Sequence, residues 1–162
     1  MNQIFLTCGA LVLLSTIILS MNKTFLRTEQ DALKSEIGIT GVSLATSVIE
    51  EASGMAFDKN TDTNTTLSTA SLTPVVSLGP DGTEKYKSFN DFDDFNNFDT
   101  TFAMTRSGLF RVRASVFYVT PIDPTTASSS PTWHKKILVT VTSPSMEDTL
   151  KMDYIYSYFY FR

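Results

Sequence analysis

The stretch "FLTCGALVLLSTIILS", residues 5–20, is an apolar run whose role decides how the rest of the chain is interpreted. No charged side chain occurs before Lys23, and the uncharged segment 4–21 is close to the ~20 residues that a helix needs to cross a bilayer. Three roles fit such a segment. It could be a signal sequence that is removed, a membrane anchor, or a helix that packs against copies of itself.

The residues around this run do not favour a cleaved signal sequence. Such a signal begins with a positively charged region and ends at a pair of small residues, whereas this chain begins "MNQ" and offers only "ILS" or "LSM" for cleavage. Cys8 comes too early, in "FLTC", to suggest a lipoprotein signal. We therefore expect the functional chain to keep this helix.

The composition of the chain excludes several classes of function. The chain has 162 residues, a net charge of −4 and no basic stripe, so nucleic acid is not an expected partner. A single cysteine forms no intramolecular disulfide, and a single histidine, His134, leaves no Cys/His metal cluster. His134 stands beside Trp133 and is expected to be an exposed or packing residue. We predict no enzymatic activity and no cofactor, apart from the calcium site considered below.

The helix is predicted to continue beyond the apolar run. No proline occurs before Pro74, and apolar residues recur at spacings of seven and four residues, with charged residues between them. This pattern indicates an amphipathic helix that extends the first to about residue 56, roughly 80 Å in all. We expect "GITG", residues 38–41, to bend or unwind it locally. The recurring apolar residues are Leu26, Leu33, Ile37, Leu44, Val48 and Met55.

The second half of the chain is predicted to be rich in β-strands. Segments 108–120, 134–143 and 150–161 alternate or are rich in β-formers, and "GPDG" suggests a hairpin over 75–86. The inward faces should be Phe110, Val112, Ala114, Val116 and Tyr118 in one strand, and Ile137, Val139 and Val141 in the next.

The predicted fold class is therefore α+β. A long N-terminal α-helix, apolar and then amphipathic, packs on a C-terminal antiparallel β-sheet of about four strands. The expected parts are the helix over 1–57 with its apolar segment 1–22, a Thr/Ser/Asn-rich linker over 58–73, and a β-rich head over 74–162.

This arrangement resembles that of type IV pilins and type II secretion pseudopilins. The segment "GITGVSLATSVIEEASGMAFDKNT", residues 38–61, is similar to the second helical half of small pilin-like proteins. The chain differs from the family at Phe5, where the family has a glutamate, and in the absence of a basic leader from these residues. These two differences fit a chain that has already been processed or a relative that is exported by another route. The resemblance implies a structural subunit that sits in the bacterial inner membrane and is then assembled into an extracellular filament.

In such a filament the apolar helix would contact copies of itself in a dry core. The residues expected there are Leu6, Leu11, Leu13, Leu14, Ile17, Ile18 and Leu19. Small residues such as Gly9 and Ala10 would allow close approach of neighbouring helices. One alternative is a single-pass membrane-anchored protein with a β-rich binding domain, and the other is a pseudopilin that forms only a short assembly. Lys23 and Arg27 follow the span, which for an anchored protein would place the head in the cytoplasm.

The segment "FNDFDDFNNFDTTF", residues 89–102, combines aromatic and acidic residues. Phenylalanine recurs at every third position from Phe89 to Phe98, which predicts a helical or 3₁₀ turn docked on the sheet. The densely spaced oxygen ligands suggest calcium, although the spacing is not that of an EF-hand. The candidate ligands are Asp91, Asp93, Asp94 and Asp99. The alternative is a solvated acidic face on a loop held by its phenylalanines.

Thr/Ser-rich stretches with few or no charges occur at 59–71 and 124–132 and are typical of solvated extracellular loops. Their hydroxyl groups could accept O-linked sugars. The candidate acceptors in the first stretch are Thr61, Thr63, Thr65, Thr66, Ser68 and Thr69. The alternative is that both stretches are unmodified loops.

Overall fold

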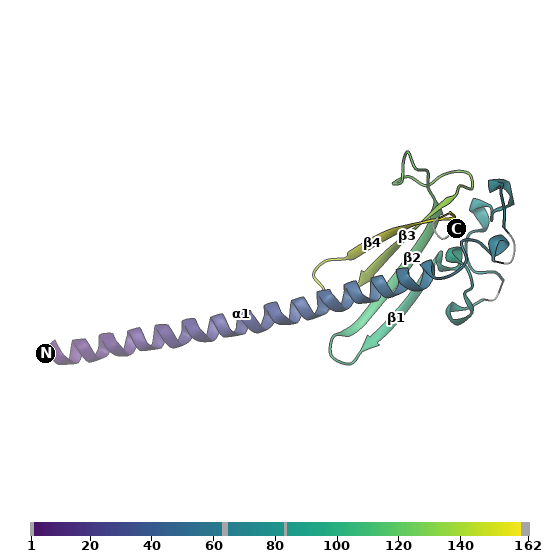
Figure 1. The fold of residues 1–162 in the computed structure, drawn as a ribbon. Helices are drawn as coiled ribbons and strands as arrows, with labels where there is room; N and C mark the ends of the chain where they lie inside the picture. Colours follow the sequence, from purple (N-terminus) through teal and green to yellow (C-terminus); the bar gives the residue numbers. More distant parts are fainter. Residues whose placement is uncertain (1, 63–64, 83, 160–162) are drawn as a thin grey trace. The chain divides into compact units, whose positions relative to one another are not determined.

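The computed structural model describes residues 2–62, 65–82 and 84–159. It shows a long N-terminal α-helix and a four-stranded antiparallel sheet, which confirms the predicted α+β class. The helix α1 spans Asn2–Ser53, and short 3₁₀ turns separate it from the strands (Figure 1). The strands are β1 (Phe98–Met104), β2 (Gly108–Tyr118), β3 (His134–Thr142) and β4 (Leu150–Ser157).

The chain divides into two compact units, residues 1–38 and residues 39–162. The division falls inside α1, so the expected boundaries after residues 57 and 73 both lie within the second unit. The reason is that the buried face of α1 begins at Gly41, and the last turns of the helix therefore belong to the same core as the sheet. We call residues 39–162 the head.

The head buries one stripe of α1. Gly41, Ala45, Val48, Ile49 and Ala52 are buried, at the three- and four-residue spacing of one helical face. The expected unwinding at 38–41 is wrong, because α1 is helical throughout this segment. Gly41 lies against the segment around β4, where a Cβ atom would make ordinary van der Waals contacts at 3.6 Å with the side chains of Met146 and Leu150.

The sheet is an antiparallel meander in the order β1–β2–β3–β4 (Figure 1). The predicted inward faces of β2 and β3 are confirmed, since all eight of the side chains named above are buried. The register places Val112 opposite Val141 and Val116 opposite Ile137, so the two inner faces stack in pairs. The predicted third strand is also confirmed, although β4 ends at Ser157.

The predicted hairpin over 75–86 is wrong. Val75–Ser77 and Tyr86–Ser88 form 3₁₀ turns, and Gly79 and Gly82 between them adopt positive φ angles of 134° and 59°. Val76 is 95 % exposed whereas Leu78 is buried, so single residues anchor the segment and no alternating apolar face forms. The fourth strand is β1, which the sequence prediction missed and which pairs with β2 through a turn that ends at Gly108, φ 86°.

The predicted turn among the phenylalanines is confirmed as a 3₁₀ helix, η5, over Phe92–Phe95. The Phe92 and Phe95 rings are fully buried, and Phe92 packs 5.1 Å from the Tyr156 ring. Asn96 joins the turn to the sheet, because its side chain accepts a hydrogen bond from the Val116 amide at 3.0 Å. This docking places the acidic side chains of η5 beside the core.

Candidate functional site

The first candidate site is the apolar surface of α1 within residues 2–38. The side chains expected in a filament core are all exposed in the single chain, from 50 % for Ile18 to 76 % for Leu6. They are Leu6, Leu11, Leu13, Leu14, Ile17, Ile18 and Leu19. Within the described residues, α1 is the one helix long and apolar enough to cross a membrane, so it could serve as a membrane anchor or a signal sequence.

Polar side chains in this segment bond to their own helix. The Thr7 hydroxyl donates to the Ile4 carbonyl at 2.9 Å, and the Thr16 hydroxyl donates to the Leu13 carbonyl at 2.8 Å. A hydroxyl that is satisfied internally costs less to transfer into a dry environment than one that must give up a water partner. The surface is therefore compatible with lipid and with a protein core alike.

The second candidate site is a buried charged network in the head, centred on Lys135. Its Nζ donates to the Phe57 carbonyl at 2.7 Å, to Asp58 Oδ2 at 3.0 Å and to Asp93 Oδ1. The Lys135 and Asp58 side chains are fully buried, and that of Asp93 is 2 % exposed. The ammonium also lies 4.7 Å from the centre of the Phe57 ring and 5.3 Å from that of Tyr118.

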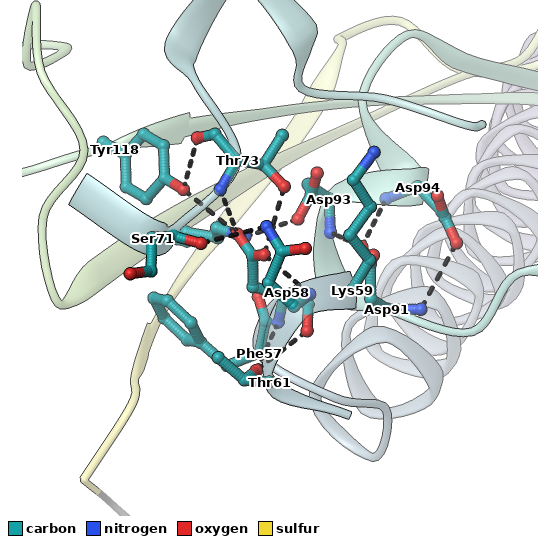
Figure 2. A network of polar contacts seen from close by, with 12 residues as sticks. Phe57, Asp58, Lys59, Thr61, Ser71, Thr73, Asp91, Asp93, Asp94 and Tyr118 are labelled. Carbon is teal, nitrogen blue, oxygen red and sulfur yellow. Dashed lines mark hydrogen bonds and ion pairs between the residues drawn. The ribbon is translucent and has the colours of Figure 1, made fainter. Parts of the chain in front are cut away.

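The Asp58 carboxylate accepts hydrogen bonds from several donors (Figure 2). Thr73 donates from its backbone amide at 2.9 Å and from its hydroxyl at 3.1 Å, and the Tyr118 hydroxyl donates at 3.3 Å. The backbone amide of Asn60 adds a further bond at 3.0 Å, because Asp58 also caps the 3₁₀ turn Lys59–Thr61. Among the described residues, no buried side-chain nitrogen or oxygen lacks a hydrogen-bond partner.

The acidic residues of η5 are held by their own backbone (Figure 2). Asp91 caps the turn, and its Oδ1 accepts from the amides of Asp93 at 2.9 Å and Asp94 at 3.3 Å. Asp94 reaches back and accepts from the amides of Asn90 at 2.9 Å and Asp91 at 3.2 Å. This reciprocal capping explains how three aspartates fit into one short buried turn.

The carboxyl groups of the network differ in proton affinity. Burial opposes the ionisation of Asp58, but the charge of Lys135 and the bonds from Thr73 hold its pKa below the ordinary value. Burial raises the pKa of Asp93 despite its contact with Lys135. Burial, the charge of Asp93 and a hydrogen bond with Asp93 raise the pKa of Asp91 to about 8. One cation faces several acids, so Asp91 keeps its proton at neutral pH.

The four candidate calcium ligands do not form one site in this structure. Asp91, Asp93 and Asp94 are buried and bonded as described, whereas Asp99 lies on β1 and pairs with Arg111 at 2.5 Å on the exposed side of the sheet. Within the described residues no group of three or more His, Cys, Asp or Glu side chains is arranged to hold a metal ion. The acidic residues of η5 serve an internal ion pair, and calcium binding stays a prediction without structural support.

The candidate sugar acceptors are in different environments. Thr61 is buried, and its hydroxyl donates to the Asp58 carbonyl at 2.8 Å, so it is not an accessible acceptor. Thr65 and Ser68 are exposed, while Thr66 and Thr69 are half-buried. Thr63 lies outside the described residues. The segment 58–73 is also more than a linker, because Asp58 and Thr73 at its two ends meet in the core.

The sequence prediction did not identify Lys135 or Asp58 as site residues. A signal for Lys135 was present, since it is in phase with the inward-facing Ile137, Val139 and Val141. No comparable signal marks Asp58, which lies 77 residues away in the chain. His134, on the opposite face of β3, is half-buried with its Nδ1 2.7 Å from the Ser157 hydroxyl, which fits the packing role expected of it.

Chemically, the network can hold the segment around Asp58 and the turn η5 against β3, and it can share protons among carboxyl groups that are shielded from water.

Comparison of the chain with protein-family models, with curated proteins and with solved structures finds no match to any of them.

Proposed function

We propose that the chain is the structural subunit of an extracellular pilus-like helical filament, in which α1 polymerises with copies of itself. The observation that carries the proposal is the exposed apolar surface of residues 4–21 at the start of a helix whose last turns are built into a folded head. A helix that is apolar all round is stable only where lipid or protein covers it.

Self-association accounts for both parts of α1: the apolar part packs against copies of itself, and the last turns carry the head. Burying each large aliphatic side chain contributes roughly 1.5–3 kcal/mol, and the run contains seven of them in the positions named above. A contact between helices that repeats without closing on itself generates a helical polymer. Before assembly the same surface lies in the inner membrane, and after assembly the heads cover the outside of the filament.

The membrane-anchor alternative is favoured by one specific observation, the length and composition of the apolar segment, which suffice for a single span. It requires no contact between copies of the chain. The two proposals therefore differ in whether the protein leaves the membrane, and this difference can be tested directly. A short secretion pseudopilus would share the helix contact but not the filament length.

The test is to shear surface material from cells that express the chain and to examine it by negative-stain electron microscopy. Fibres that contain the chain are expected, and Leu13→Asp or Ile17→Asp should abolish them, because a charge would enter a dry helix bundle. Leu67→Asp is the matched control, since this leucine is 93 % exposed in the head and its variant should assemble normally. If the unchanged chain is extracted only as a monomer in detergent and forms no fibres, the anchor proposal replaces this one.

A further inference from the structure

We propose that Lys135 and Asp93 become joined by an amide bond between Nζ and Cγ, a covalent cross-link inside the head that does not depend on filament formation. The two reacting groups are already in contact, because Lys135 Nζ donates to Asp93 Oδ1. Both side chains are buried, so no water layer separates them.

Burial raises the pKa of Asp93 and so favours the protonated carboxyl group that the reaction needs. The rings of Phe57 and Tyr118 lie 4.7 Å and 5.3 Å from Nζ, and the Phe92 ring in the same turn as Asp93 is fully buried. Within the contact between Nζ and Oδ1, a proton can pass from the lysine to the Asp93 carboxylate, which leaves an amine next to a carboxylic acid. An uncharged amine is the nucleophile and a protonated carboxyl the electrophile that amide formation requires.

Lys135 is positioned by two further acceptors. The Phe57 carbonyl, at 2.7 Å, and Asp58 Oδ2, at 3.0 Å, hold Nζ from other directions while Asp93 occupies the third. Asp58 is the poorer electrophile, because the donors from Thr73 and Tyr118 stabilise its carboxylate form. The reaction is therefore assigned to Asp93.

Asp91 is the proton-transfer group. It shares a hydrogen bond with the Asp93 carboxyl, and its raised pKa, about 8, keeps it protonated at neutral pH. Asp91 can give its proton to the Asp93 oxygen that leaves and take back the proton that Nζ loses. The capping bonds of Asp91 to the amides of Asp93 and Asp94 fix it in place for both transfers.

The reaction balances without any other reactant. Nζ attacks Cγ of the Asp93 carboxylic acid, the N–C bond forms, one C–O bond breaks and a water molecule leaves, while Asp91 ends in its starting protonation state. Because the two groups are held in contact by the fold, their effective concentration can reach ~10⁵ M or more, which offsets the unfavourable equilibrium of amide formation in water. The product ties η5 to β3 across 42 residues of chain.

The experiment is peptide mapping of the full chain, purified in detergent under non-reducing and reducing conditions alike. Trypsin should fail to cleave after Lys135 and should release peptide 88–106 joined to peptide 114–136, at the sum of their masses less one water. Fragmentation should place the link at Asp93. Separate linear peptides with cleavage after Lys135 would show that the contact is an ion pair only. A link from Lys135 to peptide 35–59 would assign the reaction to Asp58 and overturn the assignment to Asp93.

Variants separate chemistry from folding. Lys135→Arg keeps a buried cation but no acylable amine, so the joined peptide should disappear, while Lys136→Arg on the opposite face of β3 should keep it. In Asp91→Asn the linked fraction should fall to a trace, since acid–base assistance is worth ~100-fold or more in rate. Fluorescence of Trp133, which stacks on Tyr158, reports whether each variant is folded. A folded Asp91→Asn chain that is still fully linked would overturn the role of Asp91.

Discussion

The two units of the molecule depart from the usual distribution of polar and apolar residues in opposite directions. Residues 2–38 expose large apolar side chains such as Leu6, whereas the head buries the charged side chains of Lys135 and Asp58. The head completes its unusual interior within the chain, because every buried polar side-chain atom of the described residues has a partner. Most of the large apolar side chains of residues 2–38 are not covered by other described parts of the chain. The comparison teaches that folding alone completes the interior of the head, whereas the exposed apolar residues of the first unit are covered by association only under the proposed function.

The largest effect is expected when the buried cation is removed. Compared with a chain that carries the ion pair and no cross-link, Lys135→Met leaves the Asp58 and Asp93 carboxyl groups without their shared partner, and breaking a buried pair from one side costs about 3–5 kcal/mol. Loss of the proposed cross-link would add to this cost. Denaturant unfolding of the full chain in detergent, followed by Trp133 fluorescence, measures the loss. The control is Lys136→Met, because Lys136 pairs with the half-exposed Asp153 and should contribute less than about 1 kcal/mol. Similar costs for the two lysines would contradict the contrast between interior and surface charge.

A second, smaller effect should depend on pH. Because the pKa of Asp58 is lowered in the folded head, its carboxylate stabilises the fold fully above its unfolded pKa near 3.9, and this contribution is lost as pH falls through the folded pKa. Asp58→Asn should cost about 1.5–3 kcal/mol at neutral pH, the range for hydrogen bonds to a charged group. Urea titrations of both chains between pH 7 and pH 2 should show this difference shrinking on acidification. A difference that is constant with pH would mean that the charge of Asp58 is not what stabilises the head.

The smallest effect compares one substitution in the two units. Ala45 is fully buried in the head, so Ala45→Leu should overpack the face between helix and sheet and cost about 1–3 kcal/mol of the free energy of unfolding. Ala10 is exposed on the first part of the same helix, and Ala10→Leu should change the unfolding of the head by less than ~0.5 kcal/mol. The same fluorescence measurement checks both. If Ala10→Leu also destabilises the head, the two parts of α1 are not energetically separate.

The features that could be predicted from the sequence are those set by residues close together in the chain. The apolar run, the long helix, and the alternation in β2 and β3 follow from side-chain period, so the fold class and the inward faces could be derived from sequence. The "GPDG" turn signal was misread, because glycine and proline mark a change of direction but do not require strands on both sides of it. The sequence prediction misses the strand β1 because only Phe98 is buried and Thr100 interrupts the apolar face that Phe98 shares with Phe102 and Met104.

The buried network could not be derived in the same way. Lys135 meets Asp58 across 77 residues and Asp93 across 42, and no periodicity links such positions. The sequence therefore leaves the acidic segment around η5 as either a calcium site or a solvated acidic face, since the cation that faces it comes from a distant strand. The inward phase of Lys135 was the available clue, because a lysine in line with three buried aliphatic residues needs an acidic partner.

The meander order of the sheet has a consequence for the sequence of folding events. Each strand pairs with the strand next to it in the chain, so the sheet can form by successive short-range steps. The meeting of Asp58 with Lys135 closes a much longer loop and is expected to come late. Until then Lys135 stays hydrated on an open sheet face, and the desolvation of its charge coincides with the arrival of the end of α1. The head would thus acquire its kinetic barrier to unfolding only in the final step, when water leaves the network.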